Sequence, residues 1–367
     1  MSVNIVVLGA GVSGLTSALK LAQHGDSSIT VVARDMPGDY SPNYASPWAG
    51  ANFQPFSPED QCRWEERSWP EMSRLAAHVP EAGIHFQLSH VYRREKDAQS
   101  GVSSFDSMFI QNPWYSRLFP DFRELSPDEL PPGVTSGCQF TGICINTALY
   151  LPWLVGQCRK AGVVFRRGAV THVKQLQSMH HTGEPADVII NTSGLGAKTL
   201  GGVEDGDMIP IRGQIVLVEN ECPTMYNVSG TDDGDDEVSY AMTRAIGGGT
   251  VLGGTYQKGN WDPNPDPQMT ERIIRRCVAL RPDIANGKGA SDVRIIRSGV
   301  GLRPYRKSGV RVEADMKAVG NGTLVVHNYG HAGWGYQGSY GCAEHVVELV
   351  DSFVQSKATP QGVRSRW

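Results

Sequence analysis

Three glycines near the start of the chain form a pattern that binds phosphate groups. Gly9, Gly11 and Gly14 follow the apolar run 5–8 and precede a segment with helical spacing. In such a turn the first glycine permits a tight bend, the second lets the backbone approach a pyrophosphate, and the third lets the helix pack against the strand. The helix N-terminus adds N–H donors and a positive dipole. A second apolar run, 29–33, follows at βαβ spacing, so the sequence predicts a dinucleotide site that also includes Ala10, Val12 and Ser13.

Two features bear on which dinucleotide binds there. The run 29–33 is followed by Arg34 and Asp35, and an acidic residue at this place usually takes the ribose hydroxyls, whereas an arginine accepts a 2′-phosphate. NADP therefore stays open on this pair alone. Near the other end of the chain, an apolar strand at 325–329 runs into a second glycine-rich loop before a helix. Two anion-binding loops far apart in the sequence favour a long cofactor such as FAD, held at the isoalloxazine end by Ala332, Gly333, Trp334, Gly335 and Tyr336.

Composition narrows the class of protein. The chain has 367 residues, of which 40% are hydrophobic, so it can bury two cores or one large one. Its formal charge of −4 argues against nucleic acid and anionic membranes as partners. The 7 cysteines lack metal-ligand spacing and favour buried free thiols, with a Cys222–Cys277 pair as the alternative.

The order of the expected elements predicts an α/β protein with a discontinuous nucleotide domain. Periodicity indicates helices at 60–79, 144–160, 269–280 and 339–355, and strands at 163–165, 187–191, 211–218, 239–256, 293–302 and 323–329. Residues 80–135 read as short strands and proline-rich connections with little periodicity, and the acidic run 232–237 reads as a solvated loop or a mobile cover. We expect a Rossmann-like FAD-binding domain from 1–52, 138–200 and 290–367, and an inserted mixed-sheet α+β substrate domain from 53–137 and 201–289.

Seven segments of the chain follow one another in a distinctive order: VVLGAGVSGLTSALKL, PWAGANFQPF, NTSGLGA, PIRGQI, VLGGTYQKGNWD, GVGLRPYR and HNYGHAGWGYQGSYG. Together they resemble the D-amino-acid oxidase and D-aspartate oxidase family, most closely its fungal D-amino-acid oxidases. The resemblance implies an FAD enzyme that oxidises D-amino acids to imino acids, which hydrolyse to 2-oxo acids and ammonia while oxygen becomes hydrogen peroxide. It also implies a homodimer.

The same resemblance implies roles for individual residues. Arg303, in GLRP, matches the arginine that binds the substrate carboxylate, and a guanidinium fork suits a carboxylate. Tyr240 and Tyr256 match tyrosines that assist it, and Gln337 is placed with them as catalytic. Asn52 and Gln54 are further pocket candidates. The expected flavin contacts, besides the loop residues above, are Arg34, Asp35, Ala45, Ser46, Gly50, Ala51, Asn52, Val170, Ser193, Gly194, Arg303 and Gln337.

No general base is evident, because His327 and His331 match positions that the family uses structurally. We therefore expect hydride transfer from Cα to flavin N5, and we expect Arg303 and the tyrosines to contribute to catalysis chiefly by orienting the substrate. Tyr256 stands where some acid-preferring members carry arginine, which favours neutral D-amino acids. Arg244 leaves a D-aspartate oxidase open, because a second cation could take a side-chain carboxylate. An NADP-dependent dehydrogenase and a flavoprotein without catalysis are the more distant alternatives.

The last three residues of the sequence bear on where the protein is located in the cell. Residues 365–367, Ser-Arg-Trp, echo the peroxisomal tripeptide Ser-Lys-Leu, with tryptophan a poor match at the last position. We expect a peroxisomal or a cytoplasmic protein.

Overall fold

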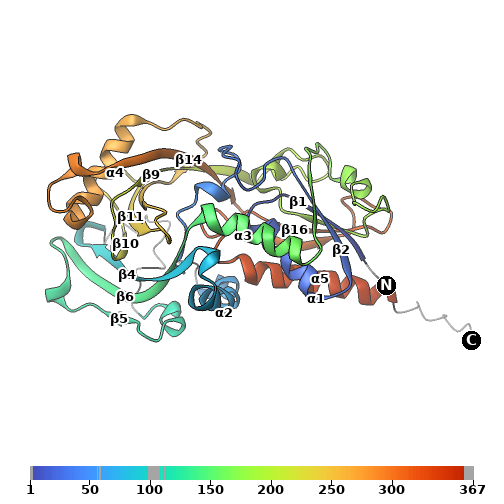
Figure 1. Ribbon diagram of the computed structural model, residues 1–367, viewed down its shortest axis with the longest axis horizontal. Helices are drawn as coiled ribbons and strands as arrows, with labels where there is room; N and C mark the ends of the chain where they lie inside the picture. Colours follow the sequence, from blue (N-terminus) through green and yellow to red (C-terminus); the bar gives the residue numbers. More distant parts are fainter. Residues whose placement is uncertain are drawn as a thin grey trace, which may run out of the picture.

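The chain forms two sheets that lie side by side along the long axis of the molecule (Figure 1). The computed structural model describes residues 3–55, 57, 59–97, 108, 110 and 112–358. Among these residues, no helix has the length and apolar character needed to cross a membrane. The tripeptide at 365–367 and Phe56 of the PWAGANFQPF segment lie outside the described residues.

The first sheet has six strands in the order β15-β16-β8-β1-β2-β7. All neighbours are parallel except β15 and β16. The central strands are buried on both faces, which is why they read as continuous apolar runs. The strands are β1 Val3–Leu8, β2 Ser27–Ala33, β7 Val164–Arg167, β8 Val188–Asn191, β15 Arg311–Asp315 and β16 Leu324–Tyr329, and three helices, α1 Val12–His24, α3 Thr147–Lys160 and α5 Ser339–Ala358, pack together beside them.

The second sheet is mixed and larger, with ten strands. Its main path is β13-β9-β12-β11-β10-β4-β6-β3, while β14 pairs with β9 and β5 with β6. Helix α4 (Pro267–Leu280) packs on β9, β11 and β12, and α2 (Arg63–His78) contacts β4 and α5. The strands are β3 Asn52–Phe53, β4 Ile84–Arg94, β5 Arg123–Glu124, β6 Val134–Ile145, β9 Met208–Val218, β10 Met225–Val228, β11 Glu237–Thr243, β12 Thr250–Thr255, β13 Gln257–Lys258 and β14 Ile295–Arg306.

This architecture confirms the predicted fold class. The four expected helices are present as α2, α3, α4 and α5, and Asn146 caps α3 by accepting a hydrogen bond from the Ala148 N–H. Within residues 80–135 the expectation of short strands was wrong for β4, which pairs antiparallel with β6 along its whole length. Buried polar side chains hid this strand: Gln87 is buried on β4 and donates to the Cys222 carbonyl oxygen at 3.0 Å.

The predicted domain boundaries need correction at two strands. Residues 138–145 and 295–306 were assigned to the nucleotide domain, yet β6 pairs with β4, and β14 pairs with β9, within the second sheet. These antiparallel pairings join segments far apart in the chain, so chain order alone could not assign them. The cysteines follow the prediction of free thiols, because all of them lie in the described part and are buried and unpaired, Cys222 and Cys277 included.

Candidate active site

Two adjoining cavities lie between the sheets and contain most of the predicted site residues. The first, which we call the glycine-loop cavity, measures about 470 Å³. The second, which we call the arginine cavity, measures about 190 Å³. The two share part of their walls, because Val12, Ser13, Ala45, Ser46, Pro304 and His331 line both.

The turn between β1 and α1 forms the floor of the glycine-loop cavity. Gly9 has a φ of +110°, which favours glycine, and a Cβ on Gly14 would overlap the Gly9 carbonyl oxygen. A Cβ on Gly11 would lie 2.9 Å from the Ser46 Oγ, which accepts a hydrogen bond from the Val12 N–H at 3.0 Å. Gly11 caps α1 without a side chain, and the first turn carries no acidic residue. The helix N-terminus therefore presents N–H groups and positive potential to an anion in the cavity.

The ends of neighbouring strands form the rest of this cavity. Arg34 and Asp35 follow β2 and pair with each other, the Arg34 Nε donating to Asp35 Oδ2 at 2.8 Å. Val170 follows β7, and Ser193 and Gly194 follow β8. Because parallel strands end at one edge of the sheet, these residues meet across the glycine turn, as a dinucleotide requires. The Asp35 carboxylate suits ribose hydroxyls, and its ion pair with Arg34 competes with a 2′-phosphate for that guanidinium.

Arg303, Tyr240 and Tyr256 meet in the arginine cavity, although they come from three different segments. The Arg303 Nη1 donates to the Thr255 carbonyl oxygen at 3.0 Å, and its Cζ lies 5.5 Å from the centroid of the Tyr256 ring. Within the described residues, no carboxylate lies within ion-pair distance of Arg303. A half-buried guanidinium with no acidic partner, facing a cavity, suits a ligand carboxylate.

Both phenols are proton donors at neutral pH. Burial raises the pKa of Tyr240 and of Tyr256, and the positive charge of Arg303 opposes this rise only in part. The phenol groups therefore keep their protons and can donate to a carboxylate that Arg303 binds.

Two glycines that sequence reasoning missed make room for these side chains. A Cβ on Gly213, in β9, would overlap the Arg303 guanidinium, and a Cβ on Gly253, in β12, would overlap the Tyr240 ring. The sequence did carry a usable pattern, since a glycine inside a strand often marks a close approach. Asn227 also lines this cavity and was missed, with no sequence pattern to identify it.

The segment around Gly50, Ala51 and Asn52 forms one wall of the arginine cavity, and Gln54 lines it too. Arg244 holds this wall from outside the cavity. Its Nε donates to the Gly50 carbonyl oxygen at 2.6 Å, and its Nη2 donates to the Ala49 carbonyl oxygen at 2.8 Å. The Arg244 side chain is buried in these contacts, so it does not supply the second cation that an acidic substrate would need.

Three predicted residues lie outside both cavities among the described residues: Gly14, Trp334 and Gln337. Gly14 acts through packing, as expected. The prediction that Gln337 is a catalytic contact needs correction, because its side chain is buried, accepts from the Gln54 N–H at 2.9 Å and donates to the Glu65 carboxylate. Gln337 precedes α5 and its amide faces α2, so tertiary packing directs it away from the cavity. Ala332, Gly333, Gly335 and Tyr336, which are expected flavin contacts, line the arginine cavity.

The two histidines beside the C-terminal loop are neutral. Burial lowers the pKa of His327 to about 4 and the pKa of His331 to about 4. His327 is held within 3.1 Å of the Asn191 amide nitrogen, between the ends of β16 and β8. This arrangement agrees with a structural role for His327.

Comparison with known proteins identifies relatives over nearly the whole chain. The family model described as "FAD dependent oxidoreductase" (DAO) matches residues 4–349. A D-amino-acid oxidase of Fusarium vanettenii is 53% identical over 96% of this chain and 97% of its own length. A D-amino-acid oxidase of Schizosaccharomyces pombe is 37% identical over 95% of this chain and 96% of its own length. Among solved structures, a glycine oxidase from Geobacillus kaustophilus superposes with a TM-score of 0.74 over 96% of this chain and 95% of its own, at 17% identity, which supports the fold alone.

Proposed function

Because the chain belongs to the DAO family of FAD-dependent oxidoreductases, we propose that it oxidatively deaminates neutral D-amino acids to 2-oxo acids, with ammonia and hydrogen peroxide as the other products. The observation that carries this proposal is the arginine cavity, in which Arg303 and two protonated tyrosines face a space that adjoins the glycine-loop cavity. The name of the Fusarium vanettenii relative supports the substrate class.

The residues of both cavities suit FAD. Gly9, Gly11 and the N-terminus of α1 would hold the pyrophosphate, Asp35 the ribose, and the other strand-end residues the adenosine half. Gly50, Ala51, Asn52 and the loop residues Ala332, Gly333, Gly335 and Tyr336 would hold the isoalloxazine half. Bound FAD would supply a two-electron acceptor for the hydride of Cα, with oxygen as the final electron acceptor.

The chain's own contribution is binding and orientation. Arg303 binds the substrate carboxylate through its fork, and the Tyr240 and Tyr256 phenols donate to the same group. With that carboxylate fixed, only one enantiomer can present its Cα–H to the cofactor while its side chain occupies the remaining space. The amine reacts in its neutral form, so no side chain is required to act as a base.

The commitment of Arg244 to backbone carbonyls supports neutral substrates over acidic ones. The test is an absorption spectrum of the purified protein together with a peroxide assay over D-alanine, D-methionine and D-aspartate, with the L-enantiomers as controls. We expect a flavin spectrum and peroxide from D-alanine and D-methionine. A flavin-bound protein that yields no peroxide from any D-amino acid would refute the proposal, and a preference for D-aspartate would replace it with a D-aspartate oxidase.

We also propose a homodimer and a peroxisomal location, with the cytoplasm as the alternative. Residues 365–367 motivate the location, because a peroxide-producing enzyme is best placed beside catalase. Imaging a fluorescent fusion with and without these three residues tests the location, and light scattering after gel filtration tests the dimer. A diffuse signal from both fusions would favour the cytoplasm.

A further inference from the structure

The strand that carries Tyr240 is irregular just before that residue. In the pairing of β11 with β12, Glu237 faces Thr255 and Tyr240 faces Gly253. Two residues of β11, Val238 and Ser239, therefore stand opposite the single residue Gly254. Such a bulge interrupts the ladder of backbone hydrogen bonds and redirects the side chains that follow it.

One guanidinium donates hydrogen bonds to backbone carbonyl groups on both strands of this bulge. The Arg276 Nη2, from α4, donates to the Val238 carbonyl oxygen at 2.8 Å and to the Gly254 carbonyl oxygen at 2.7 Å. The Arg276 side chain is only 10% exposed, and its Nη1 contacts the carboxylate of Glu237, which is itself 6% exposed. A single buried side chain thus joins the two strands where their own pairing is broken.

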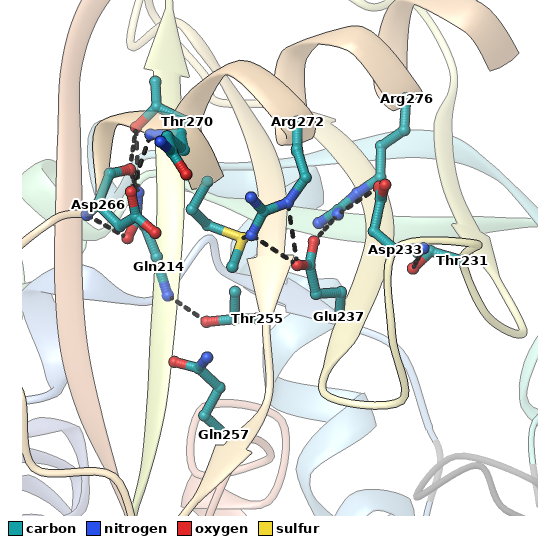
Figure 2. A network of polar contacts seen from close by, with 12 residues as sticks. Gln214, Thr231, Asp233, Glu237, Thr255, Gln257, Asp266, Thr270, Arg272 and Arg276 are labelled. Carbon is teal, nitrogen blue, oxygen red and sulfur yellow. Dashed lines mark hydrogen bonds and ion pairs between the residues drawn. The ribbon is translucent and has the colours of Figure 1, made fainter.

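Further contacts hold Glu237 and the start of α4 in place around Arg276 (Figure 2). Arg272, one turn earlier, donates from Nη2 to Glu237 Oε1 at 3.0 Å. At the start of the helix, the Gln214 Nε2 donates to the Asp266 carbonyl oxygen at 2.7 Å. The buried Glu237 also corrects the simpler reading of the acidic run, since this end of it is packed rather than solvated.

The two carbonyls lie next to the predicted substrate contacts. Val238 precedes Tyr240 by two residues and Gly254 precedes Tyr256 by two, and both tyrosines line the arginine cavity. The Tyr256 N–H in turn donates to the Asp236 carbonyl oxygen at 2.6 Å. A displacement of Arg276 would therefore reach both phenols.

We propose that Arg276 is a positioning residue, which holds the β11 bulge against β12 so that Tyr240 and Tyr256 converge on the carboxylate bound by Arg303. The proposal rests on the proposed function for the identity of that carboxylate. Its specific requirement is a planar fork that reaches two carbonyls and the carboxylates of Glu237 and Asp233 at once. Lysine keeps the charge but not the fork, so Arg276→Lys separates geometry from charge.

The experiment compares Arg276→Lys and Arg276→Gln with the matched control Arg275→Gln. Arg275 is the preceding residue on α4, its side chain is 67% exposed, and it shares the partner Asp233 with Arg276 but contacts neither carbonyl. Three quantities are measured on the FAD-loaded proteins: KM and kcat for D-alanine, the Kd of benzoate as a probe carboxylate from the flavin spectrum, and the Kd of FAD.

For both Arg276 variants we expect KM and the benzoate Kd to rise by about ten-fold or more, with a smaller change in kcat and an unchanged FAD Kd. Arg275→Gln should match the natural chain in all three. Benzoate binding within two-fold of the natural chain in Arg276→Lys would overturn the proposal, and so would a parallel loss of FAD, because that indicates general destabilisation. Where Arg276→Gln does not fold, Arg276→Lys decides.

The benzoate titration separates this proposal from the proposed function. A natural chain that binds benzoate but turns over no D-amino acid refutes the proposed function, while the effect of Arg276→Lys on benzoate binding still supports or overturns the positioning role.

Discussion

Replacing Arg303 is the sharpest test of the site, because its loss can be estimated from the contacts. One of its nitrogens, Nη1, is committed to the Thr255 carbonyl oxygen at 3.0 Å, and the rest of the guanidinium faces the arginine cavity. A carboxylate there would receive two charge-assisted hydrogen bonds, worth about 1.5–3 kcal/mol each. Their loss in Arg303→Ala costs about 3–6 kcal/mol, which corresponds to a fall of about 10² to 10⁴ in kcat/KM.

Arg303→Lys should retain one of these hydrogen bonds and fall by only about 10- to 100-fold, because an ammonium cannot reproduce the fork. The assay is peroxide production from D-alanine, with the flavin spectrum recorded on the same preparations. Both variants should keep FAD, since the residues that would hold its pyrophosphate and adenosine half line the glycine-loop cavity, which Arg303 does not line.

Arg297 provides the matched control on the same strand. Its guanidinium lies 4.6 Å from the Tyr40 ring centroid and 5.3 Å from that of Trp48, so we assign it a structural role. Arg297→Gln should leave kcat/KM for D-alanine near that of the natural chain. If Arg303→Ala instead retains kcat/KM within ten-fold, the carboxylate does not bind at Arg303 and the reasoning fails.

Three further predictions concern packing, pH and specificity. Gly14→Ala should destabilise the holoenzyme by about 1–3 kcal/mol and weaken FAD binding, because the new Cβ overlaps the Gly9 carbonyl oxygen. Denaturant and FAD titrations measure both effects. The control Gly25→Ala, where a Cβ meets nothing within 4 Å, should change neither the stability nor the FAD affinity. Burial lowers the pKa of His331 to about 4, whereas an unfolded histidine has a pKa of about 6.5. Between these two pH values the unfolded chain binds more protons than the folded chain, so the folded state loses stability as the pH is lowered. His331→Gln should accordingly lose about 2 kcal/mol less stability between pH 7 and pH 5 than the natural chain, and equal losses in denaturant titrations would contradict this. Arg244→Met should leave the ratio of D-aspartate to D-alanine turnover unchanged, and a fall in that ratio would place Arg244 in substrate recognition.

The sequence by itself determined the parts of this protein that depend on neighbours in the chain. The glycine turn after β1 could be read directly, because its bend, its close approach and the helix N-terminus all arise within six residues, 9–14. The helices and the buried strands of the first sheet followed from local periodicity in the same way. The family resemblance then predicted roles for Arg303, Tyr240 and Tyr256, which the structure brings into one cavity.

Only the tertiary structure decided which polar side chains face that cavity. Gln337 and Arg244 looked like candidates for the pocket, but Gln337 is bound to Glu65 and the backbone of Gln54, and Arg244 to the backbone of Gly50. Their direction depends on α2 and on the wall segment packed against them, which local sequence does not encode. The contact of Arg276 with both strands depends likewise on the register of β11 against β12, and that register is fixed by pairing across the sheet rather than by either strand alone.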